Sequence, residues 1–308
     1  MKSKSYFEGW YFKLAVADRV LAIISGISLG NDTQVRHAFI QVFSSTEQKS
    51  WYVTYPFDVF SASPKKLDIT IAGNRFSTDS IRLDIDSEDL QLHGVVQQRN
   101  IHPYPTTLRA PGIMGWYAYV PFMECFHGVV SMTHSLSGAV EMNGRELDFS
   151  AGNGYIEKDW GTSFPSAWIW MQSNCLASTE TGCMLSVATI PFLGRSFTGF
   201  LGFVLIEGRL IRFGTYTGAK IILLETDDKH AHVVIKDKRH ILEFDAELGP
   251  TSRLAAPRHG KMERGIYESI KGTIHLKVVD LKRYRTIFEE SGTLAGIELS
   301  EANLKSIH

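Results

Sequence analysis

The stretch that decides the fold is Gly154-Tyr155-Ile156-Glu157-Lys158-Asp159-Trp160-Gly161. In an extended chain alternate side chains point to opposite faces, so Tyr155, Glu157 and Asp159 share one face. The other face carries the remaining side chains, Ile156, Lys158 and Trp160. We therefore expect a β-strand whose two faces differ in chemistry.

Short strands extend from this segment in both directions. Ile81, Leu83 and Ile85 alternate with polar residues, which is the period of a half-buried strand. Further strands are expected, with tight connections, at residues 201–207, 210–215, 220–225, 232–236 and 241–246. Closely spaced short strands are typical of antiparallel barrels and sandwiches, so the sequence predicts an all-β fold.

Turn residues mark the connections, at Asn31-Asp32, Gly73-Asn74 and Asn143-Gly144. A helical period can be read only near residues 254–262 and in the C-terminal tail.

Two aromatic-led hairpins lie about half a chain apart. Trp10-Tyr11-Phe12-Lys13 begins one, and Trp168-Ile169-Trp170-Met171 begins the other. Each leads through a polar turn into a second apolar strand, which suggests a duplicated barrel, with chance similarity of the two hairpins as the alternative. The length of the chain also favours two domains. We expect an N-terminal domain at residues 1–150 and a C-terminal domain at 151–308, with residues 155–161 at the junction.

Composition excludes several classes of protein. The chain has 308 residues and a formal net charge of -1, which argues against a nucleic-acid partner. Three cysteines and no secretory segment point to a reducing compartment, so we expect a cytoplasmic location. The longest apolar stretches are too short for a transmembrane helix, although peripheral contact with a membrane is compatible with the sequence.

The face of Tyr155, Glu157 and Asp159 is the candidate for chemistry. Two buried carboxylates on one face cannot both stay ionised cheaply, so one would hold a proton near neutral pH. A carboxylic acid in that state can act as a general acid. If the face is exposed, the same residues are an ordinary polar strand.

Aromatic side chains supply a candidate binding wall. We expect the substrate-binding set to be Trp10, Phe12, Trp116, Tyr155, Trp160, Trp168 and Trp170. Such rings suit an apolar pocket, where their faces also stabilise a cation, and they equally suit a core. The sequence leaves these two interpretations open.

Other site types have little support in the sequence. His127, His134 and the pair His230 and His232 have no accompanying metal-ligand motif, so no metal and no cofactor are expected. Ser131 lies near His134 in the chain, but no acid nearby suggests a catalytic triad. Nucleotide-binding and hydrolase signatures are absent from the sequence.

The motifs taken together resemble the tocopherol cyclase family. The matching residues are Phe7-Glu8-Gly9-Trp10-Tyr11-Phe12-Lys13, Pro111-Gly112-Ile113-Met114-Gly115-Trp116-Tyr117, Glu124-Cys125-Phe126-His127-Gly128, Tyr155-x-Glu157-Lys158-x-Trp160-Gly161, Phe164-Pro165 and Trp168-x-Trp170-x-Gln172-x-Asn174. The resemblance implies two tandem lipocalin-like β-barrel domains, related to carotenoid hydratases and fungal Diels–Alderases. It also implies proton-initiated ring closure of a prenylated quinol to a chromanol, without metal or nucleotide.

The resemblance narrows the site. In plastid members of that family an Asn stands at the position of Asp159, so Glu157 is the better candidate for the acid and Asp159 for a helper. The substrate does not transfer with a fold, so we expect an isoprenoid or prenylated aromatic ligand without naming it. The alternative is a carrier or sensor that binds such an apolar molecule unchanged.

Overall fold

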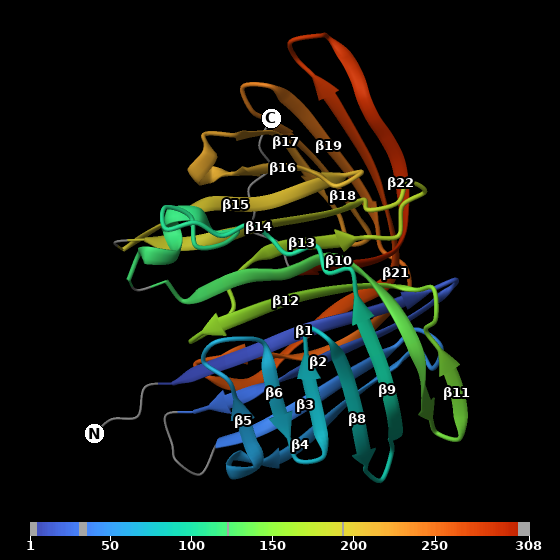
Figure 1. Ribbon diagram of the computed structural model, residues 1–308. Coiled ribbons are helices and arrows are strands. Elements are labelled where there is room, and N and C mark those ends of the chain that lie inside the picture. The colour runs from blue at the N-terminus through green and yellow to red at the C-terminus, as the bar shows by residue number, and fades with distance from the viewer. Residues whose placement is uncertain (1–4, 31–35, 122, 193, 301–308) are drawn as a thin grey trace. The chain divides into compact units, whose positions relative to one another are not determined.

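The computed structural model describes residues 5–30, 36–121, 123–192 and 194–300 (Figure 1). Almost every element in it is a β-strand, and the strands form two large antiparallel sheets, of 12 and 10 strands. The expected all-β fold is confirmed. The described residues include three short 3₁₀ helices, η1 (Phe57–Val59), η2 (Gly115–Tyr119) and η3 (Thr215–Thr217). No helix among the described residues is long and apolar enough to cross a membrane.

The first sheet has the strand order β4-β3-β2-β1-β12-β10-β9-β8-β7-β6-β5, with β11 paired to β10. Its strands are β1 (Tyr6–Val16), β2 (Arg19–Leu29), β3 (Arg36–Ser44), β4 (Lys49–Pro56), β5 (Phe60–Ala62), β6 (Asp68–Ile71), β7 (Asn74–Ser77), β8 (Ser80–Asp86), β9 (Gln91–Arg99), β10 (Cys125–Met142), β11 (Arg145–Asp148) and β12 (Asn153–Gly161).

The second sheet has the order β16-β15-β14-β13-β22-β21-β19-β18-β17, with β20 paired to β21. Its strands are β13 (Trp168–Ser173), β14 (Gly182–Phe192), β15 (Arg195–Ile206), β16 (Arg209–Gly214), β17 (Lys220–Thr226), β18 (His230–Lys236), β19 (His240–Glu247), β20 (Thr251–Arg258), β21 (Lys261–Asp280) and β22 (Arg285–Ser300).

The two sheets repeat one topology. In each, the first four strands form a meander and the first strand pairs with the last, β1 with β12 and β13 with β22. The two aromatic-led hairpins expected from the sequence are β1–β2 and β13–β14. Both therefore occupy the same place in their sheets, which supports an internal duplication.

By contacts the chain divides into two compact units, and each draws on both halves of the sequence. Unit 1 comprises Met1–Pro103, Val129–Phe164 and Leu254–Gly265, and unit 2 comprises Tyr104–Gly128, Pro165–Arg253 and Ile266–His308. That the chain folds as two domains with limits at residues 1–150 and 151–308 stays a prediction.

In unit 1 the late segment, residues 254–265, is tied to the meander by hydrogen bonds. The buried side chain of Gln41 on β3 accepts from the Ala255 backbone N–H at 2.8 Å and donates to the Ala255 carbonyl at 3.4 Å. The Ser28 hydroxyl donates to the Gly260 carbonyl at 2.7 Å. This segment thereby finds partners for its backbone groups far from its neighbours in sequence.

In unit 2 an early segment, residues 104–128, packs on aromatic side chains. The Tyr104 ring meets Phe203 of β15 edge-on, with centroids 6.2 Å apart, and Tyr117 meets Tyr216 of η3 at 6.4 Å. A β-carbon on Gly115 would lie 2.4 Å from the Tyr216 ring, and Gly115 has a φ of +59°, so glycine is required there.

Each unit has its own apolar core. In unit 1 the core takes Trp10, Phe12 and Leu14 from β1 and Ile156 from β12. In unit 2 it takes Ile169 and Met171 from β13, together with side chains of β14, β18 and β19. Alternate residues of each strand enter the core, as the period of two requires.

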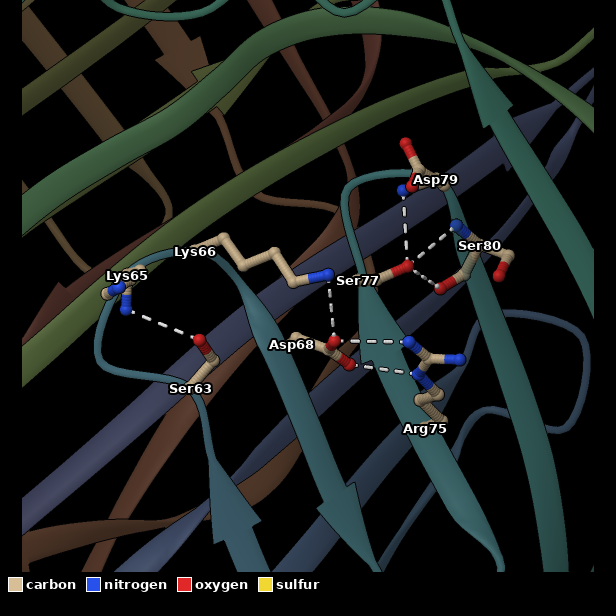
Figure 2. A network of polar contacts seen from close by, with 8 residues as sticks. All are labelled: Ser63, Lys65, Lys66, Asp68, Arg75, Ser77, Asp79 and Ser80. Atoms are coloured by element: carbon tan, nitrogen blue, oxygen red, sulfur yellow. Dashed lines mark hydrogen bonds and ion pairs between the residues drawn. The ribbon is translucent and has the colours of Figure 1, made fainter.

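The β6–β7 hairpin of unit 1 carries a network of polar contacts (Figure 2). Arg75 donates two hydrogen bonds to the Asp68 carboxylate, at 2.9 and 3.1 Å, and the Lys66 ammonium lies 3.1 Å from the same group. These cations lower the pKa of Asp68 to about 2. The network is solvent-exposed, so it orients the hairpin more than it stabilises the fold.

The turn predictions have mixed outcomes. Asn143 and Gly144 connect β10 to β11 with φ values of 51° and 78°, as the predicted hairpin turn needs. The turn between β6 and β7 is at Ala72 and Gly73, one residue earlier than predicted. The Asn31-Asp32 turn and the C-terminal tail lie outside the described residues.

The expected helix near residues 254–262 is wrong. Those residues form the end of β20, a turn and the start of β21. Their backbone hydrogen bonds run to distant partners, such as Gly260 N–H to the Thr162 carbonyl at 2.7 Å. Tertiary pairing therefore overrides a weak local period.

We predict that Gln41→Ala lowers the free energy of unfolding by about 1–3 kcal/mol, because two partly buried backbone groups of Ala255 lose their partner. Urea unfolding measures this, and limited proteolysis should show faster cleavage within residues 254–265. The exposed Gln91→Ala variant is the control. A Gln41→Ala protein as stable as the wild type would show that these bonds do not hold the segment.

Candidate functional site

The pairing of β12 with β1 builds the site. In this register Glu157 is the partner of Tyr11, Lys158 of Trp10 and Trp160 of Glu8. Partners in an antiparallel ladder share a face, so the two strands carry two different sets of side chains. We call the face with Tyr155, Glu157 and Asp159 the polar face, and the opposite face, with Phe12 and Ile156, the core face.

The polar face holds a buried hydrogen-bonded pair. The Tyr155 hydroxyl donates to Glu157 Oε2 at 2.7 Å, and the two residues are 0% and 4% exposed. Burial, then the Glu157 charge and hydrogen bond, and then Asp159 raise the pKa of Tyr155 well above its usual value. The phenol therefore stays protonated and serves as a fixed donor to Glu157.

The core face places a cation among aromatic rings. Lys158 Nζ lies 4.7 Å from the Trp10 ring centroid and 4.8 Å from that of Trp160. The same ammonium forms an ion pair with Glu8, whose carboxylate also accepts from the Tyr6 hydroxyl at 2.8 Å. These contacts lie on the side of the strands away from Glu157.

Trp10 and Phe12 belong to the core of unit 1. Trp10 stacks on Phe60 at 6.4 Å, and Phe12 packs against Phe76 at 5.3 Å. The structure therefore brings Trp10 and Trp160 together through Lys158, but it does not bring these rings to the face of Glu157.

The remaining predicted aromatics lie in unit 2. Trp168 and Trp170 are buried on the same face of β13, and Trp168 Nε1 donates to Glu298 Oε2 at 2.6 Å. Glu298 on β22 is the register partner of Trp170 and also of the buried Glu268 on β21. Trp116 lies apart from them on η2, is 51% exposed and contacts Tyr117 at 4.2 Å.

Glu298 and Lys13 are two further candidate site residues that the sequence motifs do not include. Glu298 reaches Trp168 from 130 residues away, and nothing in its local sequence indicates that pairing. Lys13 is fully buried and is the register partner of Tyr155. Its position two residues after Tyr11 could have indicated this placement, because alternation along a strand puts Lys13 and Tyr11 on the same face.

The imidazole of His134 explains why the stretch of residues 154–161 begins with a glycine. A β-carbon on Gly154 would lie 2.0 Å from His134 Nε2, so only glycine lets β12 pass the imidazole. Gln98 donates to the Ser77 carbonyl at 2.6 Å, which turns its Oε1 toward His134 Nε2 at 2.9 Å. His134 Nδ1 lies 2.9 Å from the Ser131 hydroxyl.

Ser131 and His134 do meet, but they are not arranged for nucleophilic catalysis. An amide, Gln98, stands where a triad has a carboxylate. Burial also lowers the pKa of His134 to about 3, which makes the imidazole a weak base. The group is a buried structural network.

One group of side chains in unit 1 has a metal-ligating geometry. Asp84 and Asp86 lie 3.1 and 3.2 Å from the two ring nitrogens of His93, and all three residues are close enough to share one ion. Both aspartates are exposed, and exposed acidic groups of this kind are common without an ion. We assign them no role.

The fold and the polar face define a class of protein: two-sheet antiparallel β proteins that bury a glutamate beside aromatic donors, outside the apolar core. Comparison with known proteins places the chain more narrowly. It belongs to the tocopherol cyclase-like family, whose model matches residues 95–300. The resemblance expected from the sequence motifs is confirmed.

Two plant proteins show the relationship in sequence. The chain is 28% identical over 176 residues to a probable tocopherol cyclase, chloroplastic, of Oryza sativa subsp. japonica, covering 55% of this chain and 36% of that protein. It is 36% identical over 75 residues to the chloroplastic tocopherol cyclase of Zea mays, covering 24% and 16%. The alignments thus span well under half of either relative.

Solved structures show the fold. Crystal structures of CghA, alone and with Sch210972, match with TM-scores of 0.60 and 0.58 at 9% identity. Each match covers 97% of this chain and 89% of CghA.

We predict that His134 makes stability depend on pH. Burial lowers the pKa of His134 in the folded protein to about 3, below its ordinary value of about 6.5, so the unfolded state binds the proton more readily. The contribution of neutral His134 to the free energy of unfolding is therefore fully present above about pH 6.5. It is lost at up to about 1.4 kcal/mol per pH unit as the pH drops toward 3. Urea unfolding at a series of pH values measures the slope.

The His134→Gln variant should lose this part of the slope, and the exposed His275→Gln variant should keep it. Identical slopes in wild type and His134→Gln would mean that His134 does not titrate in this way.

Proposed function

We propose that the chain is a cyclase-type enzyme that binds an isoprenoid or prenylated quinol and starts ring closure with a proton from Glu157. The observation that carries the proposal is the buried hydrogen bond from Tyr155 to Glu157 Oε2. Membership of the tocopherol cyclase-like family supports the reaction class.

The reaction balances with protein groups alone. Glu157 gives a proton to the less substituted carbon of a trisubstituted alkene, and the adjoining carbon becomes a tertiary cation. A phenolic oxygen of the substrate attacks that cation and forms the ring C–O bond. The phenolic proton then returns to the Glu157 carboxylate, directly or after passing through Asp159, so the product is an isomer of the substrate and the acid is restored.

Tyr155 orients the acid in this scheme. A carboxylic acid holds its proton on one oxygen, and the hydrogen bond from Tyr155 to Oε2 holds the carboxyl group in place. The scheme requires Glu157 in its neutral form, and the neighbouring Asp159 is the candidate to pass the phenolic proton back to it. The scheme uses Tyr155 as a positioning group, while Trp168 and Trp170 remain candidates for contact with the substrate.

A second function has one observation in its favour. A hydrogen bond donated by Tyr155 also stabilises an ionised Glu157, which would be a poor proton donor. A chain with that charge state would be a carrier or sensor that binds an apolar molecule and releases it unchanged. Incubation with a prenylated quinol separates the two functions, because only the enzyme yields a chromanol.

Peripheral contact with a lipid surface is part of the proposal. Leu108 is 93% exposed, and Trp116 and Tyr119 are 51% and 61% exposed in the same segment of unit 2. The Tyr119 hydroxyl donates to the Leu108 carbonyl at 2.6 Å, which holds these two residues together. Trp and Tyr rings suit the boundary between lipid and water, where an apolar substrate would be collected. A cytoplasmic location stays a prediction.

We predict that Glu157→Gln lowers kcat for chromanol formation by about 100-fold or more, because the amide keeps the shape but cannot donate the acidic proton. Product formation by chromatography and mass spectrometry measures this. The exposed Glu141→Gln variant on β10 is the matched control and should keep wild-type activity. An unchanged kcat in Glu157→Gln, with circular dichroism as in the wild type, would exclude Glu157 as the acid.

We predict that Leu108→Ser, Trp116→Ser and Tyr119→Ser combined abolish sedimentation with phosphatidylcholine vesicles. The control replaces Tyr267 and Tyr284 by Ser, since both are exposed aromatic residues elsewhere in unit 2. Equal sedimentation of the two variants would contradict a role for the segment in lipid contact.

A further inference from the structure

Lys158 is held from three sides on the core face of unit 1. Its ammonium lies over the rings of Trp10 and Trp160, with centroids 4.7 and 4.8 Å away, and it is ion-paired with Glu8. We call these four residues, Lys158, Trp10, Trp160 and Glu8, the lysine clamp. The Tyr6 hydroxyl donates to Glu8 at 2.8 Å and fixes the carboxylate of the clamp.

The clamp joins two strands. Lys158 and Trp160 come from β12, while Trp10 and Glu8 come from β1, and they are register partners, Lys158 with Trp10 and Trp160 with Glu8. The Lys158 and Glu8 side chains are 27% and 18% exposed, so solvent screens their attraction less than at an open surface. Ring faces and carboxylate together hold one cation in one place.

The backbone at Glu8 is also closely packed. A β-carbon on Gly26 of β2 would lie 2.3 Å from the Glu8 carbonyl oxygen and 3.0 Å from Gly9 Cα. Strands β1 and β2 therefore approach so closely that Glu8 has little freedom to move. The clamp anchors β12 to a fixed point.

Glu157 is the residue next to Lys158 and points to the opposite face. Consecutive residues of a strand share one peptide plane, so a rotation of that plane, which displaces the whole Glu157 side chain, also displaces the Lys158 side chain. The clamp opposes that rotation at the point where Glu157 pairs with Tyr11. On the polar face Tyr155 holds the Oε2 atom of Glu157, and on the core face the lysine clamp holds the backbone of β12.

We propose that Lys158 is a positioning residue for Glu157, acting through the β12 backbone from the far side of the strand. This inference rests on the proposed function of Glu157 as the acid. A displacement of a reacting group by about 1 Å can lower a rate by about 100-fold, so a loosened strand should slow the reaction without preventing binding.

The test compares Lys158→Met with Lys158→Arg in the full chain. Met keeps the length of the side chain but removes the charge, whereas Arg keeps the charge and can stack on the same rings. We expect Lys158→Met to lower kcat at least tenfold with KM changed less than twofold. We expect Lys158→Arg to return kcat to within about threefold of the wild type.

Lys49→Met is the matched control. Lys49 Nζ also lies over a tryptophan ring, that of Trp51 at 5.2 Å, in the same unit but at an exposed position. This variant should leave kcat and KM unchanged. A Lys158→Met protein with normal kcat and a lowered melting temperature would show that the clamp is only structural and would overturn the proposal.

A second readout needs no substrate. Carboxyl-carbon NMR of protein with ¹³C-labelled glutamate, assigned with Glu157→Gln, follows the titration of Glu157. The Glu8→Gln, Lys158→Met double variant keeps the net charge, so a shifted or broadened Glu157 titration in it reports displacement of the carboxyl group. An unchanged titration overturns the proposal, even where Lys158→Met is too unstable for kinetics.

The two readouts separate the two inferences. If the wild type forms no product from a prenylated quinol, the proposed function fails, and the NMR titration still decides whether Lys158 positions Glu157. If the wild type is active and neither readout responds to the loss of Lys158, the clamp inference alone fails.

Discussion

The antiparallel pairing of β1 with β12 is the constraint on which the candidate site depends. It joins the first strand of the first sheet to the last, and it sets Glu157 opposite Tyr11 and Lys158 opposite Trp10. A slip of β12 by one residue would turn that strand over, placing Glu157 in the core and Ile156 outside it. The core of unit 1 excludes that slip, because Phe12 and Ile156 are fully buried in it.

The second sheet is closed by an equivalent pair of strands. There β13 pairs with β22, and the glutamate on the last strand, Glu298, accepts a hydrogen bond from Trp168 on the first. In the first sheet the glutamate on the last strand, Glu157, accepts from Tyr155. Burying a carboxylate is costly unless a donor compensates it, and Tyr155 compensates the buried Glu157. The two sheets thus share a topology but hold these glutamates in different ways, since Trp168 reaches Glu298 from the neighbouring strand and Tyr155 reaches Glu157 from the same strand.

Much of the local structure could be predicted from particular residues. The alternation in residues 155–160 predicted the two faces of β12, and the aromatic-led hairpins predicted β1–β2 and β13–β14. Prediction failed at residues 254–262, where a weak helical period lost to backbone hydrogen bonds with Gln41 and Thr162. Those partners lie far away in sequence, and no local pattern could indicate them.

The sequence by itself determined the β class, the strand alternation and the family, because each is written in residues that are neighbours or lie at short, regular spacing. The role of Glu157 stays a prediction. Tertiary structure decided which groups meet those residues. It placed Trp10 and Phe12 in the core, away from Glu157, and set Trp168 against Glu298. It also brought residues 254–265 into unit 1. The reason is physical: strand pairing joins residues by register between segments, and register is fixed only when a whole sheet and its core form together.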